Sequence, residues 1–367
     1  MATELIVAGR RGRRHLPLFW VGLVFCLAVL PLSWVSAQSP TRSPSGLTAP
    51  PREVTSKLRT AVDRGFHYLL TQRRPSGDFD AEYPVAADAL VGLAFLAGGY
   101  TERIGPKNYT AAVRSCTDAL LRRQLPCGYF SDRQSRMYGH GFATLYFAQL
   151  YGMSHRPKVI QAALRRAIRV IEISQGADGG WDYEPHAECG GSVTGASDTS
   201  ITVCQAMALR AARNLGLAVS PTVIAQARRY IQQAQNGDGG FRYRQQQGAY
   251  VMDQSSFPRS AAGVCILYSL GGYNTDAIRR GFSYLRGRYR KPNLYPYYAQ
   301  YYCSQAMFQS GGKDWREYFT FMRDRLLALQ NIEGGWPPRA RENKVQATAM
   351  VLIVLQLPYR LLPILER

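Results

Sequence analysis

The chain has 367 residues, of which 46% are hydrophobic and 19% are charged. This balance allows a sizeable core and excludes a wholly disordered chain. The formal net charge of +20 favours anionic partners such as lipid headgroups, an anionic membrane surface or acidic glycans. Zinc-finger spacings and RNA-binding signatures are absent from the sequence, so nucleic acid is not an expected partner.

Residues 1–37 have the features of a targeting segment. Four Arg residues between positions 10 and 14 precede an apolar run, and the small residues Ser36 and Ala37 suit a signal peptidase. We expect residues 1–37 to be a signal peptide, or alternatively an uncleaved membrane anchor, and the remainder to be exported to the periplasm or cell envelope. A Pro/Ser-rich linker follows over 38–53, and residues 54–367 are expected to form one domain.

Six of the seven cysteines lie beyond residue 37. An exported protein can form disulfides. Cys204, Cys265 and Cys303 fall within apolar helical stretches, which favours free cysteines in a core. Cys127 and Cys189 fall in loops and are better candidates for pairing, although the sequence does not identify their partners.

A loop signature recurs along the chain and divides it into repeats. Each copy combines Gln, Gly and a closing aromatic residue. The copies are QRRPSGDF at 72–79, QLPCGYF at 124–130, QGADGGW at 175–181, QNGDGGF at 235–241 and QNIEGGW at 330–336, with a degenerate RYRKPNLY at 288–295. The glycines suit a tight turn and the aromatic can wedge between neighbouring hairpins, so the signature is interpreted as structural.

The helices on the two sides of each signature differ in character. An amphipathic helix precedes it, as in 221–235, and a more uniformly apolar helix follows it, as in 262–272. Six such alternations predict an all-α (α/α)6 toroid of six helical hairpins, with an inner ring of buried helices inside an outer ring. An open superhelical solenoid is the alternative.

The loop copies resemble the repeat motifs of squalene–hopene cyclases and of protein prenyltransferase β subunits, over roughly residues 54 to 358. The resemblance implies an (α/α)6 toroid that handles an isoprenoid or polycyclic lipid in its central cavity. The stretches 192–212 and 297–312 also resemble a bacterial group of exported toroid-repeat proteins without an assigned reaction.

The catalytic motifs of these two families are largely missing from this sequence. The cyclases protonate an alkene with a DxDD motif, of which only Asp198 and the following Thr199 remain here. The prenyltransferases bind zinc through an Asp-x-Cys pair and a distant His. This chain has no Asp-x-Cys pair and no His beyond His186. Neither a metal nor a cofactor is therefore expected.

Candidate site residues come from aligning the apolar helices. The alignment places Asp88, His140, Asp198, Arg259 and Lys344 near helix N-termini that would converge on one mouth of the ring. Such a set can bind an anionic headgroup or perform acid–base catalysis, with Asp198, His140 and Asp88 as catalytic residues and the two cations as ligand-binding residues. Alternatively, both Asp residues are N-caps and His140 is a satisfied core or loop histidine.

Tyrosines are dense at the start of the fifth apolar helix. Tyr298, Tyr301 and Tyr302 are expected to line the cavity and bind ligand, with interhelical packing as the alternative.

The sequence leaves two main functional hypotheses, and a third has less support. An isoprenoid or polycyclic-lipid enzyme would use aromatic faces to stabilise carbocations. A non-catalytic cell-envelope binding or scaffold protein would explain the missing acid motif and zinc ligands. A glycan-acting toroid would need two carboxylates facing one cleft, for which Asp88 and Asp198 are the only candidates.

Overall fold

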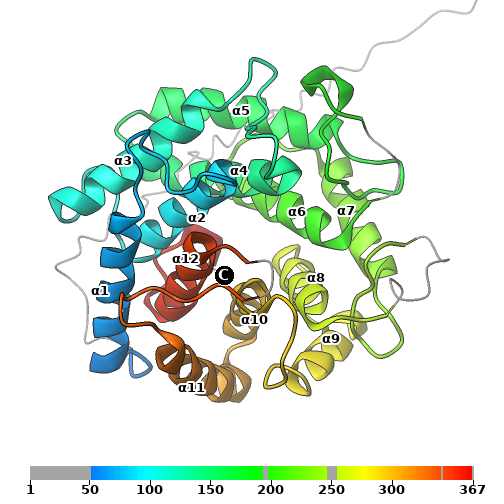
Figure 1. The fold of residues 1–367 in the computed structure, drawn as a ribbon. Coiled ribbons are helices and arrows are strands. Elements are labelled where there is room, and N and C mark those ends of the chain that lie inside the picture. The colour runs from blue at the N-terminus through cyan, green and yellow to red at the C-terminus, as the bar shows by residue number, and fades with distance from the viewer. Residues whose placement is uncertain (1–50, 193–196, 246–253, 340–341, 366–367) are drawn as a thin grey trace, which may run out of the picture. The chain divides into compact units, whose positions relative to one another are not determined.

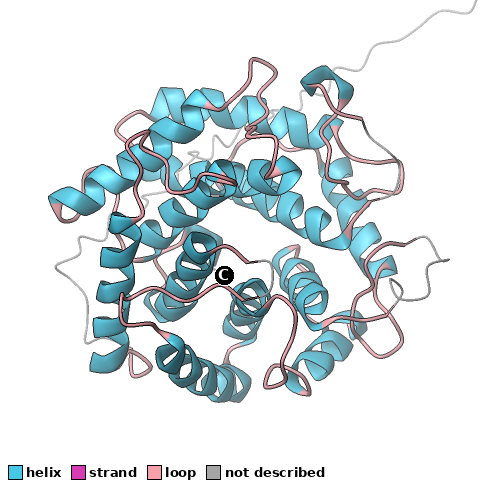
Figure 2. Cartoon of the chain, in the orientation of Figure 1, coloured by secondary structure: helices cyan, strands magenta, loops and turns pink. Residues whose placement is uncertain are grey.

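The computed structural model describes residues 51–192, 197–245, 254–339 and 342–365. The expected signal segment 1–37 and most of the linker 38–53 lie outside these ranges. Every regular element in the described ranges is a helix (Figure 2). None of the described helices has the length and apolar character needed to cross a membrane.

Twelve α-helices alternate between an outer and an inner position in the described part of the chain. The outer helices are α1 (Ser56–Thr71), α3 (Lys107–Arg122), α5 (Pro157–Ile173), α7 (Pro221–Gln233), α9 (Asp276–Arg286) and α11 (Gly312–Leu329). The inner helices are α2 (Pro84–Ala97), α4 (Arg136–Leu150), α6 (Thr199–Asn214), α8 (Phe257–Ser269), α10 (Pro296–Ser310) and α12 (Lys344–Gln356). The short 3₁₀ helices are η2 (Tyr151–Met153), η3 (Ala187–Cys189), η4 (Leu357–Tyr359) and η5 (Pro363–Leu365).

The inner helices form a closed ring (Figure 1). Each packs against the next along the chain, and α12 packs back against α2. The outer helices cover them, as α3 covers α2 and α9 covers α8. The contact between α12 and α2 would be missing from an open solenoid, so the predicted (α/α)6 toroid is confirmed.

Burial follows the sequence pattern of each helix. The outer helix α5 buries one stripe that includes Ile160, Leu164 and Ile171, while Arg165 and Arg166 are exposed. The inner helix α2 has no charged face, and every one of its residues is buried. The difference arises because an inner helix is covered by two ring neighbours and an outer helix.

In four copies of the loop signature, the Gln side chain ties the loop to the next outer helix. The Gln330 side-chain amide donates to the Gly334 carbonyl at 2.7 Å and to the Ala61 carbonyl of α1 at 2.8 Å, which joins the sixth repeat to the first. The same pair of bonds, to a loop glycine and to the following outer helix, is made by Gln124, Gln175 and Gln235. The signature therefore has the structural role predicted for it.

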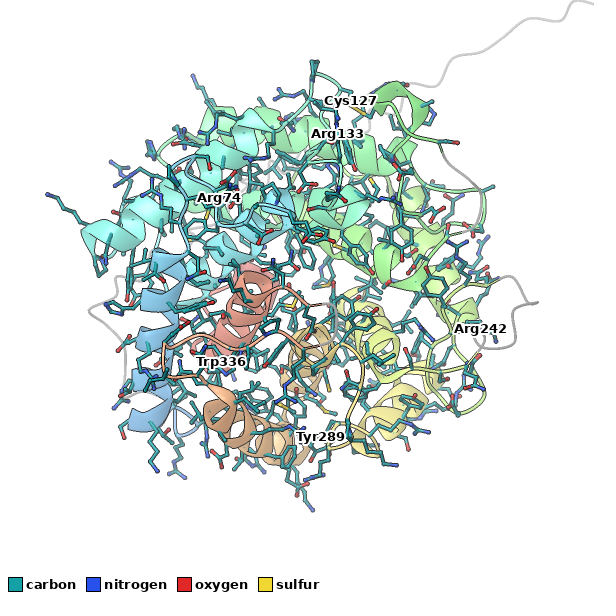
Figure 3. All side chains as sticks on the ribbon, viewed as in Figure 1. Arg74, Cys127, Arg133, Arg242, Tyr289 and Trp336 are labelled. Carbon is teal, nitrogen blue, oxygen red and sulfur yellow. A yellow bond between two sulfur atoms is a disulfide. The ribbon has the colours of Figure 1, made fainter. Side chains whose placement is uncertain are left out.

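The closing aromatics fill the space between hairpins. Trp181 and Trp336 are fully buried. Their indole N–H groups donate to the carbonyls of Ile171 and Leu326 at 2.7 and 2.8 Å. Trp336 is labelled in Figure 3. Its ring lies beside α1, where a Cβ added at Gly65 would come within 2.9 Å of it. The ring thus closes on packed aromatic surface as well as on hydrogen bonds.

The segment after α12 covers the C-terminal ends of the inner helices. At the end of α12 itself, the Gln356 amide donates to the Ala94 carbonyl near the end of α2 at 3.1 Å. The backbone N–H of Ile364 donates to Gln149, near the end of α4, at 2.9 Å. The short helices η4 and η5 also contact α10 and α6, so this segment lies over the C-terminal side of the ring.

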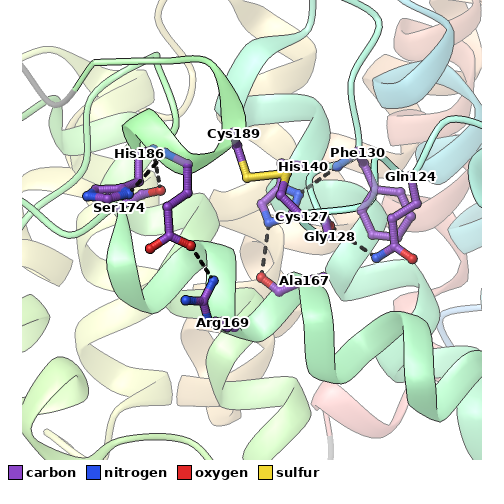
Figure 4. Close-up of a disulfide and its surroundings, with 11 residues drawn as sticks. Gln124, Cys127, Gly128, Phe130, His140, Ala167, Arg169, Ser174, His186 and Cys189 are labelled. Carbon is purple, nitrogen blue, oxygen red and sulfur yellow. Dashed lines mark hydrogen bonds and ion pairs between the residues drawn. A yellow bond between two sulfur atoms is a disulfide. The ribbon is translucent and has the colours of Figure 1, made fainter.

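A disulfide joins two of the loops on the outside of the ring. Cys127 in the second signature loop is bonded to Cys189 at the end of η3 (Figure 4). The free cysteines in the described ranges are buried: Cys116, Cys204, Cys265 and Cys303. The predicted core roles of the last three are confirmed, and the two loop candidates are each other's partners.

Candidate functional site

A cavity of about 1010 Å³ lies at the N-terminal ends of the inner helices. All six inner helices contribute to its wall. The contributing residues include Ala86 and Leu90 of α2, Tyr138 and Phe142 of α4, Ser200 of α6, Phe257, Pro258 and Arg259 of α8, Tyr298 of α10, and Gln346, Ala347 and Met350 of α12.

The wall changes from apolar to basic along the depth of the cavity. Leu90, Phe142 and Met350 lie one to two turns inside their helices and make the inner part apolar. Arg288, which is half-buried, and Lys291, which is exposed, come from the segment between α9 and α10 and form the basic rim. This arrangement suits a ligand with an apolar body and an anionic end.

Asp198 is the N-cap of α6. Its Oδ1 accepts hydrogen bonds from the backbone N–H groups of Ser200 at 2.6 Å and Ile201 at 3.3 Å, and its Oδ2 accepts from the Tyr183 hydroxyl at 2.8 Å. The side chain is fully buried and does not line the cavity. Ser200 and Tyr183 do line it, so Asp198 reaches the cavity through their hydroxyls.

Tyrosine hydroxyls line one side of the cavity. The Tyr183 and Tyr243 hydroxyls lie 3.0 Å apart, and the Tyr138 hydroxyl donates to the Ser200 hydroxyl at 2.5 Å. The Tyr298 hydroxyl is buried without a hydrogen-bond partner in the described part of the chain. Burial raises the pKa of Tyr138 and of Tyr298 well above the ordinary value, so both stay neutral.

Asp88 and His140 lie elsewhere. The Asp88 carboxylate accepts the Phe79 backbone N–H at 2.9 Å, and His140 Nδ1 accepts the Phe130 backbone N–H at 3.1 Å (Figure 4). His140 Nε2 donates to the Ala167 carbonyl at 3.1 Å. Both side chains are fully buried and neither lines the cavity. Burial lowers the pKa of His140 to about 4 and raises that of Asp88 well above its usual range.

The expected placement of Asp88 and His140 at the mouth is therefore wrong. Each side chain accepts the backbone N–H of the closing aromatic residue in the loop before its own helix. Hydroxyl groups accept the equivalent aromatic N–H in three other repeats: Thr202, Ser260 and Thr348. Asp198 precedes its helix, whereas Asp88 lies a full turn inside α2. The sequence alignment of the apolar helices therefore matched two positions that are not equivalent in the structure. Asp88 is also within its helix and is not an N-cap.

The two predicted cations have different surroundings. Arg259 lines the cavity, with its guanidinium carbon 5.6 Å from the Tyr243 ring centre and its Nη2 bonded to the Gln254 carbonyl at 2.9 Å. Burial lowers its pKa, against the opposing effect of Asp198. Lys344 is exposed at the start of α12 and is not part of the cavity wall, so its expected place there is wrong.

The three tyrosines predicted as ligand-binding residues in α10 do not all face the cavity. Tyr298 lines the cavity. Tyr301 and Tyr302 are buried outside the cavity wall and contact each other edge to face, with ring centres 4.8 Å apart. The packing alternative therefore applies to these two residues, and the expected cavity lining applies to Tyr298.

Glu342 is a cavity residue that the sequence analysis did not single out. Its Oε1 accepts the backbone N–H groups of Tyr297 and Tyr298 at 2.9 and 2.8 Å, in the first turn of α10. Its Oε2 is buried without a hydrogen-bond partner among the described residues. Burial raises the pKa of Glu342 to about 7, while the hydrogen bonds and Arg339 oppose the shift. The sequence feature that could have indicated Glu342 is that it is the only acidic residue between Trp336 and the last apolar helix.

Potential metal ligands are scattered. Within the described ranges, no group of three or more His, Cys, Asp or Glu side chains is arranged to hold a metal ion. The cavity wall consists of aromatic, aliphatic, hydroxyl, amide and basic groups together with one carboxyl group.

No family model matches the chain. Drimenyl diphosphate synthase of Streptantibioticus cattleyicolor is 28% identical over 217 residues, which cover 58% of this chain. The match spans 37% of the length of that relative. The similarity is thus distant and limited to a part of the relative.

Solved structures share the fold at low sequence identity. The type II terpene cyclase MstE from Scytonema has a TM-score of 0.58 and 14% identity, covering 84% of this chain and 100% of that one. A variant of MstE is known with its substrate, geranylgeranyl dihydroxybenzoate, at a TM-score of 0.55. The α-1,6-mannanase GH76A of Salegentibacter sp. HEL1_6 has a TM-score of 0.62 and 7% identity, covering 83% and 99%. The chain therefore has a type II terpene cyclase-like (α/α)6 toroid, and the same fold also occurs in a glycan-acting enzyme.

Proposed function

We propose that the cavity binds an isoprenoid lipid with an anionic end and that the protein acts on it as a terpene cyclase-type enzyme. The observation that carries the proposal is a cavity that combines an apolar, aromatic interior with a basic rim. Its volume of about 1010 Å³ lies at the upper end of the range for small-molecule sites, about 300–1,000 Å³.

The interior supports carbocation chemistry. Tyr138, Phe142, Phe257 and Tyr298 contribute aromatic rings to the wall. The faces of such rings attract positive charge, and the attraction grows in a water-poor site. Aliphatic side chains complete the wall and exclude water from a reactive cation.

The rim supports recognition of an anionic end. Arg259, Arg288 and Lys291 bring three basic side chains to the cavity wall. Guanidinium groups bind phosphate oxygens in a forked geometry, and an ammonium adds charge. The curated relative is named for a diphosphate product, which is the class of headgroup that this rim suits.

A non-catalytic lipid-binding protein is the second candidate. It is favoured by Asp198, the remnant of the cyclase acid motif, which is buried with both oxygens hydrogen-bonded. The glycan-hydrolase alternative loses its residue pair, because neither Asp88 nor Asp198 lines the cavity.

Export of the protein is part of the same proposal. It is supported by the targeting features of residues 1–37 and by the disulfide between Cys127 and Cys189, since structural disulfides persist in oxidising compartments. An anionic membrane surface is a fitting source for a lipid ligand, given the net charge of +20.

The test begins with native mass spectrometry of the purified protein, to detect a retained lipid. Binding of farnesyl and geranylgeranyl diphosphate is then measured by calorimetry, and products are analysed after dephosphorylation. Arg288→Gln should weaken binding by about 5- to 10-fold, the loss of one charge-assisted contact. Arg279→Gln, on the outer helix α9 and outside the cavity, is the matched control. Failure of the wild-type protein to bind any isoprenoid would overturn the proposal.

A further inference from the structure

We propose that Glu342 is the proton donor of this cavity, a role that rests on the proposed function. Among the described residues that line the cavity, Glu342 alone carries a carboxyl group. It comes from the segment before α12 but is hydrogen-bonded to the start of α10, so it sits where the fifth and sixth repeats meet.

The two oxygens of Glu342 have different surroundings. Oε1 accepts two backbone N–H groups at 2.9 and 2.8 Å, while Oε2 has no partner in the described part of the chain. A proton on Oε2 therefore has no competing acceptor among the described residues. The carboxylate left after transfer is stabilised by the two amides and by the positive end of the α10 dipole.

Several charged or titratable groups face the same cavity. They are Arg259 from α8, Arg288 and Lys291 from the α9–α10 segment, Tyr138 from α4, Tyr183 and Tyr243 from loops, Tyr284 from α9, Tyr298 from α10, Tyr83 before α2, and Tyr295 before α10. Arg339, in the same segment as Glu342, acts to lower the pKa, yet burial prevails and brings it to about 7. An ordinary Glu, with a pKa of about 4.3, would be ionised at neutral pH, whereas Glu342 keeps a substantial protonated fraction.

The proposed step is balanced without a further reagent. The O–H bond at Oε2 breaks, and the π electrons of an isoprenoid double bond form a new C–H bond. This leaves a carbocation and the Glu342 carboxylate. Further π electrons close the rings, and the final cation loses a proton to water. Glu342 regains its proton from solvent.

Asp198 is a positioning residue in this arrangement. Its oxygens are occupied by the Ser200 and Ile201 N–H groups and by the Tyr183 hydroxyl. No oxygen is left to present a proton to the cavity. Its effect on a ligand passes through Ser200 and Tyr183.

The first arm of the test compares Glu342→Gln with the wild type. Gln keeps the side-chain oxygen that accepts the two amides but cannot donate an acidic proton. We expect farnesyl diphosphate to bind within about 3-fold of wild type and turnover to fall by at least about 100-fold. The matched control is Asp132→Asn, because Asp132 accepts the Val85 N–H at the start of α2 at 2.8 Å but does not line the cavity. This variant should retain turnover.

The second arm needs no turnover. A farnesyl analogue with an ammonium group in place of the cationic carbon should bind the wild type more tightly as pH rises from 6 to 8, because Glu342 becomes ionised. This pH dependence should vanish in Glu342→Gln. Unchanged turnover together with unchanged pH dependence would overturn the assignment of Glu342 while leaving the proposed function intact. Absence of isoprenoid binding by the wild type would instead overturn the proposed function.

Discussion

The loops of the fourth and fifth repeats have opposite properties. In the fourth, Gln235 bonds to Gly239 and to α9, and Phe241 is fully buried. In the fifth, the segment 288–295 lacks the signature, lines the cavity and leaves Leu294 75% exposed. Copies that keep the signature hold the ring together, and the copy that loses it forms the rim of the cavity.

The N-terminus of α10, the inner helix of the fifth repeat, is bonded by a side chain from the next repeat. The start of α10 is bonded by Glu342, which belongs to the following repeat. Asp132 holds the start of α2 from the following repeat in the same manner, but away from the cavity. The loops that keep the signature are therefore expected to stabilise the fold, and the segment 288–295 with Glu342 is expected to act on the ligand. Substitutions in the two regions can test this division.

The largest effect should come from the closing aromatics. Trp336→Ala should lower the free energy of unfolding by about 3–5 kcal/mol, because a fully buried ring is lost at the closure between α12 and α1. Tyr295→Ala removes the corresponding aromatic of the degenerate copy, which is 39% exposed, and should cost about 1 kcal/mol or less. Urea unfolding measures both. Equal losses would contradict the division between the two loops.

A pH-dependent effect of about 3 kcal/mol is expected from His140. Its folded pKa of about 4 lies below the ordinary value of about 6.5. The stability that neutral His140 provides is therefore complete above pH 6.5 and is lost as pH falls from 6.5 towards 4. His140→Thr introduces the acceptor found in the third and sixth repeats. Its stability, measured by urea unfolding at several pH values, should fall less than that of wild type over this range. Parallel curves would contradict the prediction.

The loop glycines should show an intermediate effect. Gly239 has a φ of +85°, and a Cβ there would lie 2.4 Å from the Arg280 carbonyl. Gly239→Ala should therefore destabilise the protein by about 2–3 kcal/mol. Gly237, in the same loop, has open space around its Cβ position, so Gly237→Ala should change stability by less than about 0.5 kcal/mol. Thermal melts of the pair would separate them, and similar melting temperatures would refute the steric explanation.

The smallest effect on stability is expected at the rim. Leu294→Ser should alter the free energy of unfolding by less than about 0.5 kcal/mol, because the side chain is largely exposed. Leu294 lines the cavity beside Lys291 and is an apolar residue of the rim, where we expect it to contact the part of the isoprenoid chain next to the anionic end. Farnesyl diphosphate should therefore bind the variant several-fold more weakly, as calorimetry would show. Unchanged affinity would remove Leu294 from the binding surface.

Sequence periodicity predicted the helices because each helical pattern is local. The cavity residue Arg259 was also found, from the alignment of helix starts, and Tyr298 was found from the density of tyrosines in its helix. Asp88 was misplaced because its role depends on the Phe79 N–H needing an acceptor, which the pattern of apolar residues does not reveal. Glu342 was missed because its surroundings arise only when the last two repeats meet.

Ring closure also determines how the molecule opens. In an open array of repeats, the terminal units have a single neighbour and fray first. Here α1 is bonded to the last signature loop through Ala61 and Gln330, and α2 packs against α12. Backbone amides of the first and last inner helices should therefore exchange with deuterium as slowly as those of α6, on the opposite side of the ring.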